Sequence, residues 1–389
     1  MSAGRIIALV GRRDEPTDGV ADYCDWLGGS LAGYGYQLET VRVNWLELGW
    51  RAALAELKEK ARHWRGCWVL LQYTTLAWSR RGFPWRTPEV LSAVRESGVH
   101  CGVIFHDFGP FIAKGMVGTA RKICHLRVLE RLYDQADRAI FTVPIEKVSW
   151  LSAIHDKALH IPVGANCPES VLKPSAHSFD IMTVAVYCMT TDHRLTQEVN
   201  DISCAVKQAR SVAKSVRLVV LGRGSREADS ALRAEFAGTD VDVETLGLLS
   251  PDEVSRTLAC ADVLLFVRGH ISSRRGSAIA GIACGLPVVG YGGPETDWPL
   301  TEAGLLLVPE GDREGLSGAL AKVLSNPALR QALRERSRLA QAQYFSWSAI
   351  AACLVGALRD PAGASSADTG PAMPVIAGMK PSQGPDFKK

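Results

Sequence analysis

The sequence predicts an α/β protein with two doubly wound domains, each a parallel β-sheet covered by helices on both faces. Short, continuously apolar runs alternate with longer helical patterns, as strands buried on both faces require. The alternation occurs twice, on either side of residues 162–178, which are rich in Pro, Gly, Ser and Asn and have no periodicity. The length of 389 residues allows two domains that each bury their own core.

The first domain is expected at residues 1–165. Its strands are predicted at residues 5–10, 37–43, 67–72, 101–105 and 139–143. Helical patterns lie between these runs, and the longest spans residues 114–135.

The second domain is expected at residues 166–345, with the interdomain connection at its start. Its strands are predicted at residues 181–186, 217–221, 241–245, 263–267, 287–289 and 304–308. Helices are predicted at residues 278–284, 313–324 and 327–343. The C-terminal segment 346–359 contains an apolar helix, predicted at 346–358, which ends the ordered part of the chain. Residues 360–389 are rich in Gly, Pro, Ala and Ser, which predicts a flexible tail.

Composition and charge indicate a globular chain and exclude several other classes. Hydrophobic residues make up 47% and charged residues 22%, and no apolar run approaches the roughly 18 residues of a membrane span. The short apolar segment 6–10 precedes Arg12 and Arg13, the wrong order for a secretory signal. A net charge of +3 does not indicate a nucleic-acid partner, and ten scattered cysteines without a Cys-x-x-Cys pair indicate reduced thiols. We therefore expect a cytoplasmic protein.

The loop after the first strand is one candidate site, because open α/β sheets bind ligands at the carboxyl ends of their strands. It contains Asp18 and Gly19 just before a helical pattern. Glycine lets the backbone approach a ligand, and the free N–H groups of a helix N-terminus attract anions. A phosphate site is one interpretation, and an ordinary capped turn is the alternative.

Polar residues also follow two neighbouring strands of the first domain. His106 and Asp107 come directly after the run 101–105, and Gln72 and Tyr73 end the preceding strand in the same way. Histidine suits proton transfer or hydrogen bonding to a developing charge near neutral pH. This pattern alone favours neither a catalytic nor a structural role for His106 over the other.

The loop at residues 268–277 carries the most anion-binding groups. It contains Ser272, Ser273, Arg274, Arg275, Gly276 and Ser277, just before a small-residue helix. Hydroxyl groups, guanidinium groups and helix N–H groups are what a diphosphate needs. We favour anion binding over a solvated basic loop, because Arg beside a helix N-terminus is otherwise electrostatically unfavourable. A Gly-rich turn with Arg223 at 221–226 is weaker, since it lacks the full dinucleotide fingerprint.

Several motifs follow one another in the second domain. They are LGLLSPDEV at 246–254, CADVLL at 260–265, ACGLPVV at 283–289, GGPE at 292–295 and GLLLVPEGD at 304–312. In this order and spacing they resemble retaining glycosyltransferase family 4, which has the GT-B fold of two Rossmann-like domains facing each other across a cleft. Weaker similarity extends over most of residues 1–358.

The resemblance implies transfer of a sugar from a UDP- or GDP-sugar to a glycan, lipid-linked or small-molecule acceptor, with retention of configuration. It implies no essential metal and no cofactor besides the nucleotide-sugar substrate. His106 would lie near the reacting sugar, and Leu248 would lie where the base is held by backbone groups. The donor residues would be Asp18, Gly19, Arg194, Arg223, Leu248, Ser272, Ser273, Arg274, Arg275, Gly276, Ser277 and Glu295. The N-terminal domain would bind the acceptor, with Gln72, Tyr73 and Asp107, and the final helix would pack back on it.

The chain departs from the family pattern at the donor site. Two Glu residues with seven positions between them are usual in the family, and here Ser272 and Ala280 stand in their places. The usual Gly-Arg and Lys after the first strand of the second domain have no clean match, although Arg194 could substitute. Glu295 is a candidate replacement contact to ribose or sugar, or a helix cap.

Other functions stay open beside an active transferase. A catalytically inactive GT-B homologue acting as a binding or partner subunit would explain the lost carboxylates. A sugar-nucleotide epimerase on the same fold is a third, less favoured hypothesis. The helix at 114–135 carries basic residues among apolar ones, which suggests either peripheral contact with a membrane or an ordinary amphipathic surface. These residues are Lys114, Arg121, Lys122, Arg127 and Arg131.

Overall fold

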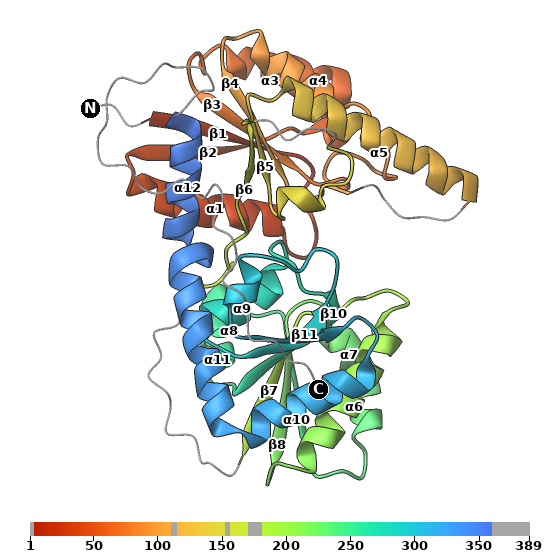
Figure 1. Ribbon diagram of the computed structural model, residues 1–389. Helices are drawn as coiled ribbons and strands as arrows, with labels where there is room; N and C mark the ends of the chain where they lie inside the picture. Colours follow the sequence, from red (N-terminus) through yellow and green to blue (C-terminus); the bar gives the residue numbers. More distant parts are fainter. Residues whose placement is uncertain (1–3, 110–114, 152–155, 170–180, 360–389) are drawn as a thin grey trace.

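Two six-stranded sheets, one in each half of the chain, form the centre of the computed structural model, which describes residues 4–109, 115–151, 156–169 and 181–359 (Figure 1). The paired strands are parallel in both sheets, and helices cover the sheets. The predicted α/β class with two doubly wound domains is confirmed.

The first sheet contains five strands close to those predicted and one that the sequence pattern does not reveal. Its strands are β1 (Gly4–Val10), β2 (Tyr36–Arg42), β3 (Trp68–Tyr73), β4 (His100–Phe105), β5 (Arg138–Phe141) and β6 (Ala158–His160). Their order is β2-β1-β3-β4-β5-β6. The unpredicted β6 is an edge strand of three half-buried residues, too short to produce an apolar run in the sequence.

Helices of the N-terminal domain connect these strands. They are α1 (Gly19–Ala32), α2 (Trp45–Leu48), α3 (Trp50–Ala61), α4 (Thr87–Arg95), α5 (Gly115–Gln135) and the 3-10 turn Ile145–Lys147. The side chain of Asp18 caps α1 by accepting a hydrogen bond from the backbone N–H of Ala21 at 3.2 Å. The predicted helix at 114–135 corresponds to α5, and Lys114 lies outside the described residues.

The second sheet has six parallel strands in the order β12-β11-β10-β7-β8-β9. These are β7 (Met182–Tyr187), β8 (Val216–Leu221), β9 (Asp242–Gly247), β10 (Val263–His270), β11 (Val288–Gly292) and β12 (Leu305–Pro309). Strand β10 runs three residues further than predicted, to His270, because polar Arg268 and Gly269 break the apolar pattern before the strand ends.

Helices of the C-terminal domain connect and follow these strands. They are α6 (Leu195–Arg210), α7 (Ser225–Glu235), α8 (Pro251–Ala259), α9 (Gly276–Ala283), α10 (Arg313–Ser325), α11 (Pro327–Ala340) and α12 (Trp347–Arg359), with a 3-10 turn at Leu300–Glu302. Ser250 and Glu253 form a capping box at α8. Helix α9 packs so close to the sheet that only glycine fits at position 281, since a Cβ atom there would lie 2.5 Å from the Leu264 side chain.

Helix α12 leaves the C-terminal domain and packs along α1 of the N-terminal domain (Figure 1). Hydrogen bonds help to fix it there: Tyr34 Oη donates to the carbonyl of Ser348 at 3.2 Å, Trp68 Nε1 to that of Leu358 at 3.1 Å, and Arg138 Nε to that of Ala357 at 2.8 Å. A π-helical turn, Gln341–Phe345, joins α11 to α12, so the predicted helix at 327–343 ends in a different geometry.

None of the described helices is long and apolar enough to cross a membrane. The predicted tail at 360–389 lies outside the described residues, as does most of the predicted connection between the domains.

Candidate functional site

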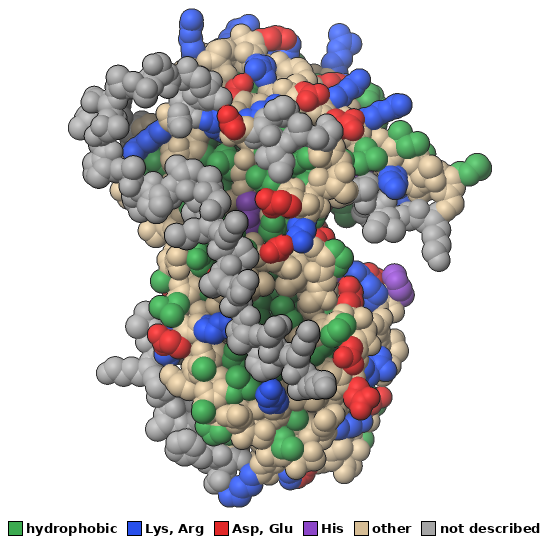
Figure 2. All heavy atoms as spheres, in the orientation of Figure 1, with side chains coloured by type: hydrophobic (Ala, Val, Ile, Leu, Met, Phe, Trp, Pro, Cys, Tyr) green, Lys and Arg blue, Asp and Glu red, His purple; other side chains and the backbone are tan. Residues whose placement is uncertain are grey.

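The two sheets each have one switch point, where the strand order reverses and a crevice opens at the carboxyl ends. In the first sheet this point lies between β1 and β3, and in the second between β7 and β10. Figure 2 shows the molecule narrowed and hollowed between the two domains. The sequence-predicted site residues lie in the loops at these edges, so the fold brings the two sets toward one another.

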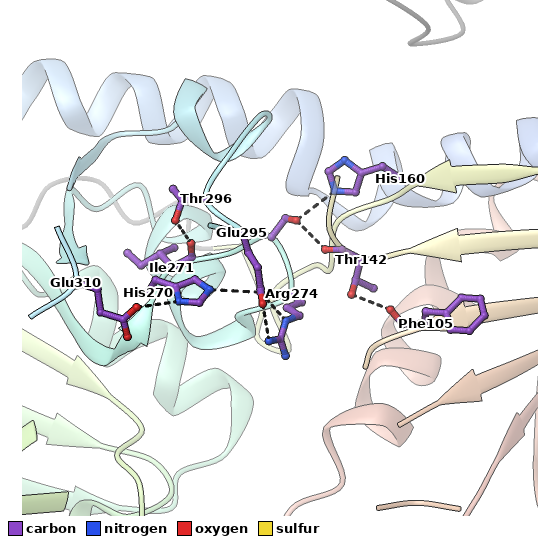
Figure 3. Close-up of polar contacts among 10 residues, drawn as sticks. Phe105, Thr142, His160, His270, Ile271, Arg274, Glu295, Thr296 and Glu310 are labelled. Carbon is purple, nitrogen blue, oxygen red and sulfur yellow. Dashed lines mark hydrogen bonds and ion pairs between the residues drawn. The ribbon is translucent and has the colours of Figure 1, made fainter. Parts of the chain in front are cut away.

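Loops from both edges touch directly. Ser273 in the β10–α9 loop donates from Oγ to the carbonyl of Thr142 at 2.7 Å, and the ring Nε2 of His160 lies 3.2 Å from the same Oγ (Figure 3). The Val163 N–H donates to the carbonyl of Ser273 at 3.0 Å. Ser273, predicted as a donor contact, therefore joins the two domains in this structure.

His106 sits at the end of β4, held by a partner from the end of β3. Its Nε2 lies 2.9 Å from Oε1 of buried Gln72. A carbonyl oxygen can only accept, so Nε2 carries the proton and donates, and Nδ1 is left as an acceptor. The ring also meets Tyr23 of α1 edge to face, with centroids 4.9 Å apart. Strand register thus produces a fixed imidazole with one nitrogen free to accept.

Burial keeps this imidazole neutral. Removal from water lowers the pKa of His106 to about 4, and the opposing effect of Asp107 is smaller. Asp107 itself accepts a hydrogen bond from the Thr75 N–H at 2.8 Å, and Tyr73 is fully buried. Of the predicted acceptor residues, Gln72 contacts His106, whereas Asp107 and Tyr73 shape the loop behind it.

Asp18 and Gly19 stand at the N-terminus of α1, facing the interdomain connection. Asp18 pairs with Arg42 at 2.8 Å in addition to capping the helix, so the capped-turn interpretation describes its side chain. Gly19 has open space at its Cβ position, with only the Asn166 amide near it at 3.9 Å. Gly19 is accordingly the residue of this loop that leaves room for a ligand.

Arg274 is not a free cation. Its guanidinium makes a two-point contact with Glu295 at 2.9 and 3.2 Å, and it also lies over the ring of Phe108 in the other domain at 5.4 Å. His270 places Nε2 3.6 Å from Glu295 and Nδ1 3.4 Å from Glu310 (Figure 3). Glu295 therefore binds side chains of its own domain, which is a role that neither sequence interpretation anticipated.

Arg275, by contrast, is half-buried, and its buried Nε atom has no hydrogen-bond partner among the described residues. Desolvation, followed by repulsion from Arg274 and Arg268, lowers its pKa to about 10. Arg268 near the end of β10 is in the same condition, with a buried and unpartnered Nε. Neither guanidinium forms an ion pair with a carboxylate within the described ranges.

Arg268 is the site residue that the sequence reasoning missed. It lies at the start of the basic loop at 268–277, yet the pattern drew attention to the pair at the helix N-terminus. Its position in the sequence could have revealed it, since a charged residue seldom occurs at the end of an otherwise apolar central strand. The buried Glu198 is within its electrostatic reach, but that carboxylate already accepts from the Thr190 N–H at 2.8 Å.

The first turn of α9 adds backbone donors to these cations. Its N-cap residue, Arg275, makes no side-chain capping hydrogen bond, and Gly276 has nothing within 4 Å of its Cβ position. Ser277 is half-buried beside it, and the fully buried hydroxyl of Ser272 has no partner among the described residues. The uncapped N–H groups, the Ser272 hydroxyl and the guanidinium groups of Arg268 and Arg275, which form no ion pair within the described residues, are donors that could hold an anion, and we call them the anion cradle.

Three other predicted donor residues have partners or lie exposed. Arg194 binds Asp192 of its own loop at 2.8 Å. Arg223 crosses between the domains, donating to Asp14 at 3.1 Å and to the carbonyl of Thr17 at 2.8 Å. Leu248 is 51% exposed, in the turn before α8. Arg194 and Arg223 are therefore less available to an anion than Arg268 and Arg275.

The two positions where the resemblance expects Glu are both buried. Ser272 is 0% and Ala280 1% exposed, and Ala280 belongs to the apolar core around α9. A carboxylate at position 280 would need a partner that the surrounding apolar side chains do not offer. Within the described residues, no group of three or more His, Cys, Asp or Glu side chains is placed to hold a metal ion.

Replacing Glu295 with Gln is expected to destabilise the protein in a pH-dependent way. Burial acts to raise the Glu295 pKa, but hydrogen bonds from His270 and Arg274 outweigh it and lower the pKa to about 2. The ionised Glu295 side chain therefore stabilises the fold at pH values above 4.5, its pKa in the unfolded chain, and this stabilisation is lost as the pH falls through about 2. The hydrogen bond to Glu295 also raises the His270 pKa. Protonated His270 therefore stabilises the fold below pH 6.5, its pKa in the unfolded chain, and this stabilisation is lost as the pH rises through the folded-state pKa.

Urea unfolding checks this expectation. The wild-type advantage over Glu295→Gln is expected to be largest between about pH 5 and 6.5, at about 1 to 3 kcal/mol, and to disappear near pH 2. The exposed Arg217–Glu244 pair provides the control, because Glu244→Gln is expected to cost less than about 1 kcal/mol. Equal stability of the Glu295→Gln and wild-type proteins at pH 6 would contradict the assigned contacts.

Residues 189–326 match the family described as Glycosyl transferases group 1. A relative from Corynebacterium glutamicum, named GDP-mannose-dependent monoacylated alpha-(1-6)-phosphatidylinositol monomannoside mannosyltransferase, is 29% identical over 164 residues. That alignment covers 40% of this chain and 42% of the relative, so it spans less than half of either protein. The region that matches the family, residues 189–326, contains both Arg268 and Arg275.

Solved structures share the whole architecture at low sequence identity. A glycosyltransferase from Rickettsia africae has a TM-score of 0.65 at 12% identity, covering 94% of this chain and 100% of its own. The Anabaena protein HepE in complex with UDP and glucose has a TM-score of 0.64 at 13% identity, covering 92% and 99%. A Listeria monocytogenes protein described as a UDP-N-acetylglucosamine 2-epimerase has a TM-score of 0.61 at 11% identity, covering 91% and 95%. This chain therefore has the GT-B fold, and its residues 189–326 match the group 1 glycosyl transferases.

Proposed function

We propose that the protein is a retaining glycosyltransferase that uses a nucleoside-diphosphate sugar. The observation that carries the proposal is the pair of half-buried arginines, Arg268 and Arg275, beside the uncapped N-terminus of α9: each has a buried Nε without a partner among the described residues. Buried charges without partners are costly, so a site that keeps two of them is built for an anionic ligand. A diphosphate supplies the matching charge and enough oxygens for both side chains and the helix N–H groups.

In this proposal the anion cradle acts mainly on the leaving group. When the bond between sugar and phosphate breaks, negative charge grows on the diphosphate. Fixed guanidinium groups and helix N–H groups stabilise that charge more strongly than the charge of the bound substrate, which lowers the barrier. Gly19 gives the opposite domain room to approach the same phosphates.

His106 would hold the sugar rather than exchange protons. With Nε2–H donated to Gln72, the free Nδ1 accepts a hydrogen bond from a sugar hydroxyl, and the low pKa keeps that nitrogen unprotonated. An accepted bond of this kind orients the sugar for attack and stabilises positive charge developing on the ring. Leu248, exposed before α8, would contact the base.

The relatives suggest the substrate classes. The Corynebacterium relative carries GDP-mannose and an acylated phosphatidylinositol mannoside in its name, and HepE was solved with UDP and glucose. We therefore propose a GDP- or UDP-hexose as donor and a lipid-linked glycan as acceptor, with a free glycan or small molecule as the other acceptor classes.

Incubation with a panel of UDP- and GDP-sugars and a membrane-lipid extract tests the proposal. We expect release of UDP or GDP with one donor, and a product that retains the anomeric configuration of the donor sugar. The missing carboxylates at Ser272 and Ala280 favour a second candidate, a catalytically inactive binding subunit. Nucleotide-sugar binding without release of nucleotide under any condition would support that candidate. Epimerised sugar nucleotide without transfer would instead support an epimerase.

A further inference from the structure

Helix α5 presents an exposed stripe that no sheet or helix among the described residues covers. The stripe consists of Met116, Ala120, Ile123, Arg127 and Arg131, spaced by three or four residues and so on one face of the helix. Met116 is 90% and Ile123 45% exposed. The stripe is apolar in the first half of the helix and basic in the second. Figure 2 shows hydrophobic and Lys or Arg side chains together in the region that α5 occupies in Figure 1.

A second segment widens this surface. Residues 76–86 pack beside α5, where the Arg121 guanidinium lies 5.5 Å over the Phe83 ring and the Trp85 backbone hydrogen-bonds to Cys124. The Trp85 side chain is 60% exposed and lines a groove of about 430 Å³ together with the α5 stripe. Ala120, Ile123 and Val128 supply its apolar wall, and Arg127 and Arg131 lie toward one end.

The net charge of this surface is positive. Helix α5 carries four Lys or Arg residues against Glu130 and Asp134, and residues 76–86 carry three Arg and no acidic residue. Arg127 and Arg131 form no ion pair within the described part of the chain. Exposed apolar side chains flanked by unpaired basic ones are the pattern of a surface that rests in the interface of an anionic bilayer.

We propose that the α5 stripe and the Trp85 groove dock the N-terminal domain on an anionic phospholipid bilayer. Met116, Ile123 and Trp85 enter the acyl boundary, while Arg127 and Arg131 contact phosphate headgroups. Apolar Ala120 and Ile123, followed along α5 by Arg127 and Arg131, suit acyl chains that lie below charged phosphate headgroups. A soluble protein partner would favour fewer charges at the centre of its interface. The proposal does not depend on the donor site.

Co-sedimentation of the full chain with vesicles tests the proposal without any nucleotide sugar. We expect binding to vesicles of phosphatidylglycerol and phosphatidylcholine, and little binding to phosphatidylcholine alone. Each basic residue near an anionic surface strengthens binding roughly five-fold, so Arg127→Gln with Arg131→Gln is expected to weaken it about 25-fold. Ile123→Asp is expected to weaken it about tenfold or more, because a charge replaces an inserted apolar group.

Matched controls come from the C-terminal domain. Lys322 is an exposed lysine on α10, and Val212 is 48% exposed, close to the value for Ile123. Lys322→Gln and Val212→Asp are expected to leave vesicle binding unchanged. Thermal unfolding first establishes that each variant is as stable as the wild-type protein. Loss of binding in the controls to the same degree, or wild-type binding in the α5 variants, overturns the proposal. It is also overturned if α5 substitutions abolish self-association in gel filtration instead, which would assign the face to a second copy of the chain.

This test is separate from the test of the proposed function. An α5 variant that loses vesicle binding yet transfers sugar to a water-soluble acceptor at the wild-type rate would support docking and leave the transferase intact. A protein that binds vesicles but never releases nucleotide would support docking while the proposed activity fails.

Discussion

The Arg275→Met variant is expected to be more stable than the wild-type protein and to lose binding of nucleotide sugars. Burial lowers the Arg275 pKa to about 10, and no partner for its Nε lies within the described residues, so the charge costs free energy in the unliganded fold. Replacing an uncompensated buried charge with an apolar side chain of similar length is expected to raise the free energy of unfolding by about 1 to 3 kcal/mol. Thermal unfolding without nucleotide measures this gain.

The same substitution removes a charged contact to the proposed diphosphate. Hydrogen bonds to charged groups are worth about 1.5 to 3 kcal/mol each, so Kd for the donor or for free UDP or GDP is expected to rise about 100-fold. Isothermal titration calorimetry measures the affinity directly. A gain in stability together with a loss of affinity is the signature of a residue kept for its ligand.

Arg274→Met serves as the control because Arg274 already pairs with Glu295. We expect that variant to be less stable than wild type, since it leaves the Glu295 carboxylate with one partner fewer. Its effect on nucleotide affinity is expected to be smaller than that of Arg275→Met. Unchanged affinity in Arg275→Met would remove the main support for the proposed diphosphate site.

The second large effect is expected for His106→Ala, with a fall in kcat of about 100-fold or more. The side chain would orient the donor sugar through Nδ1, so the loss should appear mainly in kcat, with donor Kd changed by less than about tenfold. Steady-state kinetics with the donor identified by the panel separates the two quantities. Loss of donor affinity with unchanged kcat would make His106 a binding residue only.

The pH profile provides a further check on His106. Its pKa of about 4 means that the ring is neutral above about pH 5, so its titration adds no acidic limb at neutral pH. Gln72→Glu would place a carboxylate 2.9 Å from Nε2 and raise that pKa. Activity of Gln72→Glu is therefore expected to fall as the pH drops through about 6 to 7, where the wild-type enzyme stays active. Gln72→Asn, which is shorter but uncharged, is the control and should show no such shift.

Sequence patterns were sufficient for the fold because hydrophobic periodicity reports burial directly. A strand covered on both faces needs a continuous apolar run, and a run such as residues 101–105 permits few other structures. The pattern failed at β6, whose three half-buried residues are defined by pairing with β5 and carry no local signal. It also stopped short in β10, where Arg268 looked like the start of a loop.

The identity of the candidate site residues followed from position after strands, which the sequence also contains. His106, Gln72 and the loop at 268–277 were all found because parallel strands place their carboxyl ends at one edge of a sheet. The hydrogen bond between His106 and Gln72 depends on strand register, which sets which side chains meet across β3 and β4. No spacing in the sequence specifies that partner.

The sequence by itself determined the α/β class, the two-fold repetition of the sheet and the loops in which ligand-binding groups gather, because these depend on periodicity and chain order. Only the tertiary structure decided which cations are free. Arg274 and Arg275 are adjacent and chemically identical in the sequence, yet Arg274 pairs with Glu295 from a distant loop, and Arg275 pairs with no carboxylate among the described residues. Charge pairing is a contact between residues far apart in the chain, so the availability of an arginine for a ligand is a property of the folded molecule.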